Sequence, residues 1–334
     1  MPPHPPTTRA ARRVSRRVRR RRTIVVAGVL VVAIAAGGYA LTRPSEADAD
    51  PPAGSATTPA APHPTESSPS ETSTSDPSPS RPAASPAPTE ASRRCDAPEV
   101  TAAIERGSDA EVIAAFGGGE EFRHAVAAGE APCIDLHRAG RTWVVVNKRN
   151  ALEPEDYWPV PQARPAAPRI VSGGGWLRAD VAAALDGLAA EAAGDGMGRL
   201  GIDSAFRPYD FQVGLYNRYV ASRGQQAADL RSARPGHSEH QTGLAVDVVA
   251  CGANGCGSHD DFRGTPQARW LAENAWRFGF IVRYEQDRTE TTGYAWEPWH
   301  LRYIGTDLAR AYRDGGFSTL EEFFGLPAAP TYVD

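Results

Sequence analysis

Residues 43–94 place the strongest limit on what this chain can fold into. They consist mostly of proline, serine, threonine, alanine and glutamate, and they show no apolar periodicity. Such a segment buries too little apolar surface to offset the entropy lost on ordering, so we expect a disordered linker. As a flexible coil of 52 residues, it would reach on the order of 40 Å. The folded part must then begin near Cys95, which leaves about 240 residues, enough for a substantial core.

The segment before the linker has the pattern of a membrane anchor. Residues 1–22 contain nine arginines and no acidic residue, and every residue from Ile24 to Leu41 is apolar or small. As a helix this run would be roughly 27 Å long, about the thickness of a bilayer core. The arginines favour a cytoplasmic N-terminus. We therefore predict a basic cytoplasmic tail (1–22), a transmembrane signal anchor (23–42) and an extracytoplasmic folded part, so that the protein is a single-pass cell-membrane protein.

A cleaved signal peptide is the alternative interpretation of the apolar run, because Gly38-Tyr39-Ala40 has the form of a cleavage site. The run is longer than the apolar region of most signal peptides, which favours the uncleaved anchor.

The charge of the folded part argues against a nucleic-acid partner. Without the nine N-terminal arginines, 27 basic residues stand against 40 acidic ones. A domain of such negative charge does not attract polyanions. We expect a monomer that contacts the membrane through its N-terminal helix alone.

All four cysteines lie in the predicted exterior part of the chain. Their order along the sequence favours the disulfides Cys95–Cys133 and Cys251–Cys256 among three pairings. An oxidising compartment also favours disulfides. A four-cysteine zinc site is the alternative, but the sequence has no Cys-x-x-Cys spacing to support it.

Helical and strand patterns predict an α+β fold in which a small antiparallel sheet is flanked by helices. We predict a small helical subdomain over 95–150, ending in a strand at Trp143–Val146, and a larger domain over 151–334. In that domain the predicted helices cover Leu177–Ala193, Pro208–Arg223 and Pro266–Phe278, and the predicted strands cover Leu200–Ala205, Leu244–Val249, Phe280–Tyr284 and Trp299–Ile304.

Two histidines and two carboxylates carry the chemistry. His240 and Asp247 lie in the stretch Ser238–Asp247, and His300 follows about fifty residues later with Glu297 three residues before it. Catalytic zinc sites combine imidazole nitrogens and carboxylate oxygens as three protein ligands and keep a fourth position open. A carboxylate beside such a site can act as an acid or base. These residue types therefore predict a site for one Zn²⁺ ion.

Several separate motifs in this order resemble the VanY-type zinc D-alanyl-D-alanine carboxypeptidases, a peptidase family that also includes D-Ala-D-Ala dipeptidases. The resemblance covers roughly half of the chain and makes residues 151–334 a zinc carboxypeptidase domain. The matching pieces are Ser204-Ala205-Phe206-Arg207 with Gln212, the run Pro235–Asp247, Trp270-Leu271 with Asn274-Ala275, Gly279-Phe280 with Arg283-Tyr284, and Glu297-Pro298-Trp299-His300.

The resemblance implies that His240, Asp247 and His300 bind the zinc ion. His237 lies three residues before His240, but it matches no ligand position of the family. We therefore expect His237 to lie outside the metal site.

The resemblance also implies two catalytic residues. Glu297 would be the general base that takes a proton from zinc-bound water and passes it to the leaving amine. The flanking Trp296 and Trp299 would raise the pKa of Glu297 toward neutrality. Arg207 would stabilise the scissile carbonyl as it becomes an oxyanion; a structural ion pair is the alternative role for this arginine.

Gln212, Ser238 and Tyr284 are implied as the binding site for the terminal D-residue and its carboxylate. The loop Cys251-Gly-Ala-Asn-Gly-Cys256 departs from the common family pattern. A small disulfide loop there would alter the rim of the cleft, so the leaving group stays open.

The function implied is a membrane-anchored, extracytoplasmic zinc carboxypeptidase that removes the C-terminal D-alanine from peptidoglycan stem peptides. D,D- and L,D-carboxypeptidase activity use the same fold and zinc chemistry, so both stay open. A D-Ala-D-Ala dipeptidase or a peptidoglycan endopeptidase of the same fold is the enzymatic alternative. A non-catalytic wall-binding module is the alternative from another class, although such a module would not need Glu297 or Arg207.

Overall fold

The computed structural model describes residues 94–166, 168–172 and 174–333. The predicted tail, anchor and nearly all of the linker lie outside these residues. Among the helices that the structure does describe, none has the length and apolar character needed to cross a membrane.

The larger domain is built on a mixed six-stranded sheet, and a separate two-stranded sheet lies beside it. The strand order of the larger sheet is β2-β4-β5-β8-β7, with β6 paired to β5. All neighbours are antiparallel except β2 and β4, which run parallel. The prediction of an antiparallel sheet is thus confirmed apart from this short pair. The strands are β1 (Gln162–Ala163), β2 (Arg169–Ile170), β3 (Leu177–Arg178), β4 (Arg199–Ser204), β5 (Ala245–Gly252), β6 (Gly255–Cys256), β7 (Phe280–Tyr284) and β8 (Glu297–Tyr303), and β1 pairs with β3.

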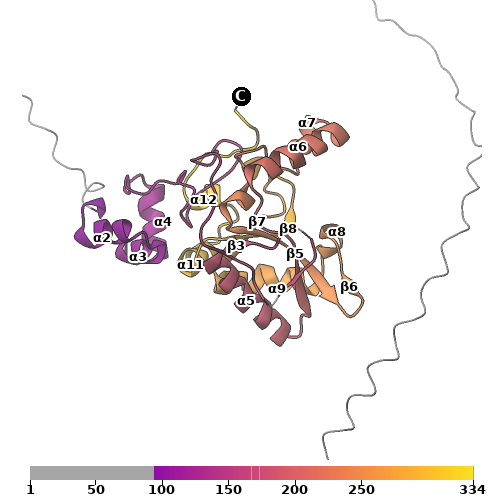
Figure 1. Cartoon of the computed structure of the whole chain (residues 1–334). Helices are drawn as coiled ribbons and strands as arrows, with labels where there is room; N and C mark the ends of the chain where they lie inside the picture. The colour runs from indigo at the N-terminus through magenta and orange to yellow at the C-terminus, as the bar shows by residue number, and fades with distance from the viewer. Residues whose placement is uncertain (1–93, 167, 173, 334) are drawn as a thin grey trace, which may run out of the picture. The chain divides into compact units, whose positions relative to one another are not determined.

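The helices of this domain flank the sheet (Figure 1). They are α5 (Ala179–Gly194), α6 (Tyr209–Arg223), α7 (Gln225–Asp229), α8 (His259–Phe262), α9 (Pro266–Asn274), α10 (Thr289–Thr292), α11 (Thr306–Asp314) and α12 (Leu320–Phe323), with the 3₁₀ turns η1 (Glu239–Thr242) and η2 (Ala275–Phe278). The helix predicted over Pro266–Phe278 is therefore α9 followed by the tighter turn η2.

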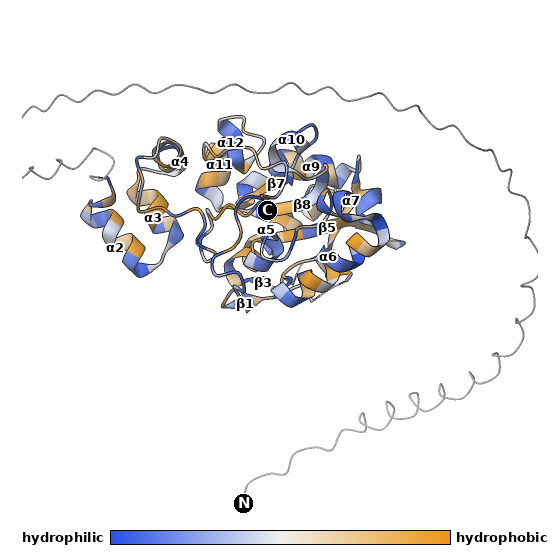
Figure 2. Ribbon diagram, turned by 90° about the horizontal axis from the view of Figure 1, so that it is seen from above, coloured by the Kyte–Doolittle hydropathy of each residue, from blue (hydrophilic) through white to orange (hydrophobic). Residues whose placement is uncertain are grey.

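Alternation along the strands separates the core from the opposite face of the sheet. Val246 and Val248 of β5 join the apolar core, where they meet Leu185 and Leu188 of α5. Successive side chains of a strand point to opposite faces, so Asp247 faces away from that core. Figure 2 shows the apolar strands at the centre and the mixed polarity of the surrounding helices.

A second apolar cluster joins the N-terminal helices to the far end of the chain. The helices are α2 (Pro98–Arg106), α3 (Asp109–Ala115) and α4 (Gly119–Ala127). Val112 and Phe122 of these helices share a core with Ile304, Leu308 and residues of α12. The helices predicted for residues 95–150 are found between Pro98 and Ala127, whereas residues 128–150 form none. The core of these helices is continuous with residues of the larger domain.

The strand predicted at Trp143–Val146 is wrong, because these residues form no strand. They are all buried, and they alternate between the two clusters: Trp143 and Val145 lie in one, Val144 and Val146 in the other. The backbone is satisfied outside a sheet ladder. Val145 N–H donates to Leu136 at 2.8 Å, and the Val144 carbonyl accepts a hydrogen bond from Arg302.

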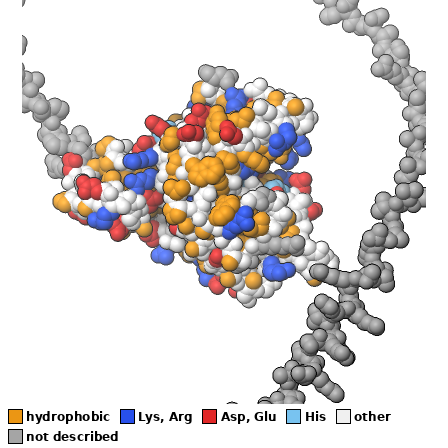
Figure 3. All heavy atoms as spheres, in the orientation of Figure 1, with side chains coloured by type: hydrophobic (Ala, Val, Ile, Leu, Met, Phe, Trp, Pro, Cys, Tyr) orange, Lys and Arg blue, Asp and Glu red, His pale blue; other side chains and the backbone are white. Residues whose placement is uncertain are grey.

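Both predicted disulfides are present, Cys95–Cys133 and Cys251–Cys256, so the alternative of a four-cysteine zinc site is wrong. The second bridge joins β5 to β6. On the face shown in Figure 3, acidic and basic side chains are interspersed over the surface.

Candidate active site

His240 lies in the short turn that precedes strand β5. It lies on η1, and Gly243 ends this turn with φ of +70°. A Cβ atom at Gly243 would come within 2.9 Å of Pro159 and 3.0 Å of the backbone nitrogen of Arg178. Glycine is therefore required both for the left-handed backbone and for the close packing. The His240 Nδ1 atom lies 2.8 Å from the carbonyl oxygen of Ala205, which leaves Nε2 facing Asp247.

Sheet register brings the other two predicted ligands together. Asp247 on β5 is the antiparallel partner of His300 on β8. The Nδ1 atom of His300 is 3.2 Å from one oxygen of Asp247, and His240 Nε2 is 3.2 Å from the other. Ligand atoms of the three residues all lie within 4.8 Å of one another, and all three residues are buried. The predicted set thus forms one compact cluster.

The chemistry of this cluster fits a divalent metal ion. Burial, together with the nearby guanidinium of Arg207, lowers the pKa of His240 to about 4, which favours the neutral imidazole that a metal ion requires. Burial also opposes charge on His300, but its hydrogen bonds to Asp247 and Glu239 raise its pKa to about 9, so this residue must lose a proton when an ion binds. Burial alone would raise the pKa of Asp247, but the neighbouring histidines hold it well below its usual value. Two imidazole nitrogens and one carboxylate are a preferred ligand set for catalytic zinc.

Glu297 begins β8 and lies beside the cluster. An i, i+3 pair on a regular strand would point to opposite faces. The pairing of β7 with β8 is irregular between Val282 and Tyr284, and Glu297 lies opposite Tyr284. Glu297 Oε2 is consequently 3.8 Å from His300 Nδ1. Burial raises the pKa of Glu297 to about 7, in the range suited to a general base.

Arg207 lies across the cluster from Glu297, just after β4. Its Nη1 atom donates to the hydroxyl of Ser204 at 2.8 Å and lies 3.7 Å from Asp247 Oδ2. Burial lowers the pKa of Arg207, although Asp247 and Glu297 oppose this shift. The Nε atom has no hydrogen-bond partner among the residues that the structure describes.

The three residues predicted to bind substrate take two different positions. Ser238 and Tyr284 line a cavity of about 250 Å³ that contains the cluster. The ring of Tyr284 is 4.8 Å from that of His300. Gln212 does not line this cavity. It is fully buried, and its amide donates to the Ser232 hydroxyl at 3.2 Å and to the Ala233 carbonyl at 2.7 Å, two residues that do line the cavity. Other residues that line the cavity are Leu215, Tyr219, Arg223, Arg231, Ser232, Ala233, His259, Asp260, Tyr294 and Trp299.

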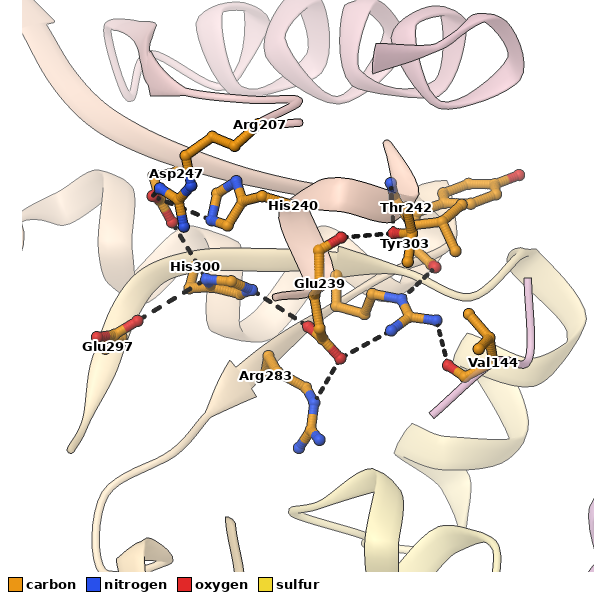
Figure 4. Close-up of polar contacts among 12 residues, drawn as sticks. Val144, Arg207, Glu239, His240, Thr242, Asp247, Arg283, Glu297, His300 and Tyr303 are labelled. Carbon is orange, nitrogen blue, oxygen red and sulfur yellow. Dashed lines mark hydrogen bonds and ion pairs between the residues drawn. The ribbon is translucent and has the colours of Figure 1, made fainter. Parts of the chain in front are cut away.

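Glu239 was not predicted as a site residue, although it precedes His240 in the motif. Its Oε2 atom is 3.2 Å from His300 Nε2, so it orients the imidazole with Nδ1 toward Asp247 (Figure 4). Carboxylates that bind the outer nitrogen of a ligating histidine fix its tautomer. The only signal in the sequence was an acidic residue inside a motif that the fold buries.

Two buried arginines hold Glu239 in place. Arg283 Nε donates to Glu239 Oε1 at 2.9 Å, and Arg302 Nη1 donates to the same oxygen at 2.7 Å. Although burial favours the protonated form, these guanidinium groups keep the pKa of Glu239 far below its usual range. Arg302 also donates to the carbonyls of Thr142 and Val144 at 3.1 and 2.6 Å. The site is thereby tied to the segment that precedes residue 150.

The remaining histidines of interest lie outside the cluster. His237 contacts the Asn147 carbonyl at 2.7 Å, in agreement with the prediction that it is not a ligand. His259 stacks on Trp299 with ring centroids 5.2 Å apart and lies 2.9 Å from a carboxylate oxygen of Asp203.

Comparison with known proteins agrees with this geometry. Residues 174–306 match the family model VanY, described as D-alanyl-D-alanine carboxypeptidase. The chain is 32% identical to a D-alanyl-D-alanine carboxypeptidase of Enterococcus faecium over 44% of this chain and 44% of that protein. It is 44% identical to another of Enterococcus faecalis (strain ATCC 700802 / V583), over 31% of this chain and 36% of that protein. The chain thus spans less than half the length of these curated relatives.

A solved structure is also similar. The LD-carboxypeptidase LdcB has 34% sequence identity and a TM-score of 0.51, over 56% of this chain and 86% of that chain. The fold and the His–Asp–His cluster place the chain among carboxypeptidase-like proteins with a candidate metal site. The chain belongs to the VanY-type D-alanyl-D-alanine carboxypeptidase family.

Proposed function

We propose that this chain is a zinc-dependent carboxypeptidase that removes the C-terminal D-alanine from peptidoglycan stem peptides. One observation carries the proposal. The buried cluster of His240, Asp247 and His300 has Glu297 on one side, 3.8 Å from His300, and Arg207 on the other, 3.7 Å from Asp247. This arrangement supplies a metal site, a base and an oxyanion donor around one cavity.

One Zn²⁺ ion would be held by Nε2 of His240, Nδ1 of His300 and the carboxylate of Asp247. The remaining ring nitrogens are occupied, because His240 Nδ1 faces the Ala205 carbonyl and His300 Nε2 faces Glu239. When bound, such an ion acidifies water and polarises a carbonyl group.

Glu297 and Arg207, beside the metal site, carry out the proton transfer and the stabilisation of the oxyanion. Glu297, with a pKa of about 7, takes a proton from the attacking water and delivers it to the amine of the departing D-alanine. Arg207 donates to the carbonyl oxygen as negative charge develops there. A fixed donor of this kind contributes on the order of 3 kcal/mol in a site shielded from water.

The cavity suits a small terminal residue that carries a carboxylate. Its walls offer the hydroxyls of Ser238 and Tyr284 and the guanidinium groups of Arg223 and Arg231. Charged and hydroxyl donors are strong ligands of carboxylates. Gln212 contributes by holding the wall at Ser232 and Ala233.

We also propose that the N-terminal segment anchors the protein in the cell membrane with the catalytic domain outside. The arginine-rich residues 1–22, the apolar run Ile24–Leu41 and the proline-rich linker support this topology. A linker reaching on the order of 40 Å would let the domain act within the wall.

The function can be tested on residues 94–334 loaded with zinc. The protein is incubated with pentapeptide and tetrapeptide stems, and released D-alanine is followed by mass spectrometry with and without a chelator. We expect chelator-sensitive release, and the preferred stem identifies D,D- or L,D-activity. No release from either stem, despite stoichiometric zinc, would contradict the proposal and favour an endopeptidase or a wall-binding module.

Glu297→Gln should lower the rate of D-alanine release about 10²- to 10⁴-fold while zinc stays bound, because the general base is lost. Inductively coupled plasma mass spectrometry would measure the zinc content. The matched control is Glu290→Gln, an exposed glutamate on α10, which should leave the rate unchanged. Full activity in Glu297→Gln would assign the base elsewhere.

A further inference from the structure

A groove lined by aromatic side chains adjoins the catalytic cavity and has no role in the reaction described above. Its volume is about 860 Å³. Three of its large apolar residues are exposed, namely Trp158 (55%), Trp176 (42%) and Phe211 (52%). Exposed apolar surface gathered in a concave site is a mark of ligand binding.

The groove and the catalytic cavity share a wall. Arg207, Leu215, Tyr219, Asp247 and His259 line both. The two hollows are therefore neighbours at Asp247 and Arg207, which places the groove directly beside the metal cluster.

Three consecutive residues after β4, Ala205 to Arg207, line the groove, and Arg207 lines the cavity as well. The Ala205 carbonyl faces the imidazole of His240, and the ring of Phe206 is 4.7 Å from that of Trp158. The Phe206 N–H donates to the Trp176 carbonyl at 2.8 Å. Trp158 thus contacts the residue directly before Arg207. The groove lies on the side of the cluster marked by Arg207, away from Ser238 and Tyr284, which line only the cavity.

The groove also offers polar groups at its edge. Gln162, Ser172 and Asp203 line it. The Nε2 atom of Gln162 is buried and has no hydrogen-bond partner within the described part of the chain. One face of Trp176 is covered by Arg164 at 4.7 Å. Flat apolar surfaces edged by amide, hydroxyl and carboxylate groups match a ligand with an apolar face and a polar rim.

We propose that this groove binds the acetamido-sugar part of the wall glycopeptide while the stem peptide enters the catalytic cavity. This inference rests on the proposed function. Flat exposed indole rings match the face of a ring-shaped ligand better than they match the small alanine side chains at the end of a stem peptide. A pyranose ring has an apolar C–H face for an indole, and its hydroxyl and acetamido groups can bind Gln162 and its neighbours. A stem of four residues reaches roughly 13 Å when extended, enough to cross Arg207 and Phe206.

The test compares two substrates that differ only in the sugar. Zinc-loaded residues 94–334 are assayed with a free stem peptide and with the same stem on the N-acetylglucosaminyl-N-acetylmuramyl disaccharide. Trp158→Ala and Trp176→Ala should each lower kcat/KM for the disaccharide substrate roughly two- to tenfold, the effect of losing one ring contact. They should do so mainly through KM and leave the free peptide unaffected. Trp158→Phe should restore most of the loss.

Val160→Ala is the matched control, because Val160 is exposed beside Trp158 but does not line the groove. It should change neither substrate. Equal losses on both substrates would make the groove a peptide site and overturn the proposal, and so would unchanged kinetics on both.

A binding measurement separates this proposal from the proposed function. The disaccharide alone should change the tryptophan fluorescence of the wild-type protein and bind more weakly to the two alanine variants, even if wild type releases no D-alanine. No fluorescence change would overturn the proposal. Competition for the groove by a peptide of residues 43–94 without any sugar binding would also overturn it, and would assign the groove to the proline-rich linker.

Discussion

Glu239 shows how one charged residue can be placed where a carboxylate is otherwise unfavourable. It is fully buried and lies between His300 and two buried arginines, Arg283 and Arg302. Desolvation of three charges is offset only while each has its partners. Arg283 has a second partner in Glu321, at 2.8 Å, whereas Arg302 otherwise binds only backbone carbonyls. Loss of the Glu239 charge would therefore affect Arg302 most.

Glu239→Gln should lower the free energy of unfolding by about 3–5 kcal/mol, because it leaves a buried guanidinium without its counter-charge. It should also weaken zinc binding roughly 10- to 100-fold through the loss of orientation of His300. Urea denaturation and competition with a chelator measure the two effects. Glu191→Gln, which breaks a surface pair with Arg277 in which both side chains are more than 40% exposed, should change stability by at most about 1 kcal/mol.

Close packing around single glycines also affects stability at the scale of individual residues. A Cβ atom at Gly119 of α4 would lie 2.2 Å from the carbonyl oxygen of Asp307 at the start of α11. Gly119→Ala should therefore destabilise the protein by about 1–3 kcal/mol in thermal or urea unfolding. Gly194→Ala, at the end of α5 with no atom within 4 Å, is the control and should be neutral or slightly stabilising. Equal stability of both variants would show that α4 and α11 can separate without penalty.

At the scale of helices and strands, the local sequence pattern predicted which elements form but not which elements they contact. The predicted helices and strands of the larger domain are present, except that Leu177 and Arg178 form β3 ahead of α5. Asp247 and His300 meet in the register of β5 and β8, and η1 adds His240 to them. The strand predicted at Trp143–Val146 was wrong. Its side chains alternate because they face two apolar clusters, and a β-strand in a sheet is only one structure that produces such a pattern. The Val144 carbonyl accepts its hydrogen bond from Arg302, which is more than 150 residues away in sequence and carries no local signal.

The two disulfides close loops of different length and should differ in their effect on stability. In the chain-entropy account, removing Cys95–Cys133, with a separation of 38 residues, should cost about 4 kcal/mol. Removing Cys251–Cys256, with a separation of 5, should cost about 2 kcal/mol. Serine double variants compared by urea denaturation provide the measurement. A larger loss at the short loop would show that native contacts of β6, and not loop length, dominate.

Over the described part of the molecule, apolar side chains from both sides of residue 150, the predicted domain boundary, pack in the same clusters. Helices α2 to α4 share a cluster with Ile281, Ile304 and α11, and Arg302 binds the carbonyls of Thr142 and Val144. Sequence reasoning treated residues 95–150 as a separate subdomain because their helical pattern is local. Many of the contacts that join them to the larger domain come from residues beyond 280, and others come from Arg178 and His237. None of these contacts could be predicted from either segment alone.

Residues 151–334 expressed alone should therefore be unstable or aggregate, since the truncation exposes Ile304, Leu308 and Phe323 and leaves Arg302 without two acceptors. Residues 94–334 should unfold in one cooperative transition. Circular dichroism melting of the two fragments distinguishes these expectations. A 151–334 fragment that melts cooperatively and binds zinc as tightly as 94–334 would contradict the shared core.

The alternating segment 143–146 also bears on how this chain can vary in length. Its odd-numbered side chains enter one apolar cluster and its even-numbered ones the other. Inserting one residue within the segment, directly after Trp143, would exchange the sides of the three valines that follow. Inserting two residues would return every side chain to its own side. The segment itself can therefore change length by pairs of residues more readily than by single ones, whereas the loop before it can absorb added residues without moving these four side chains.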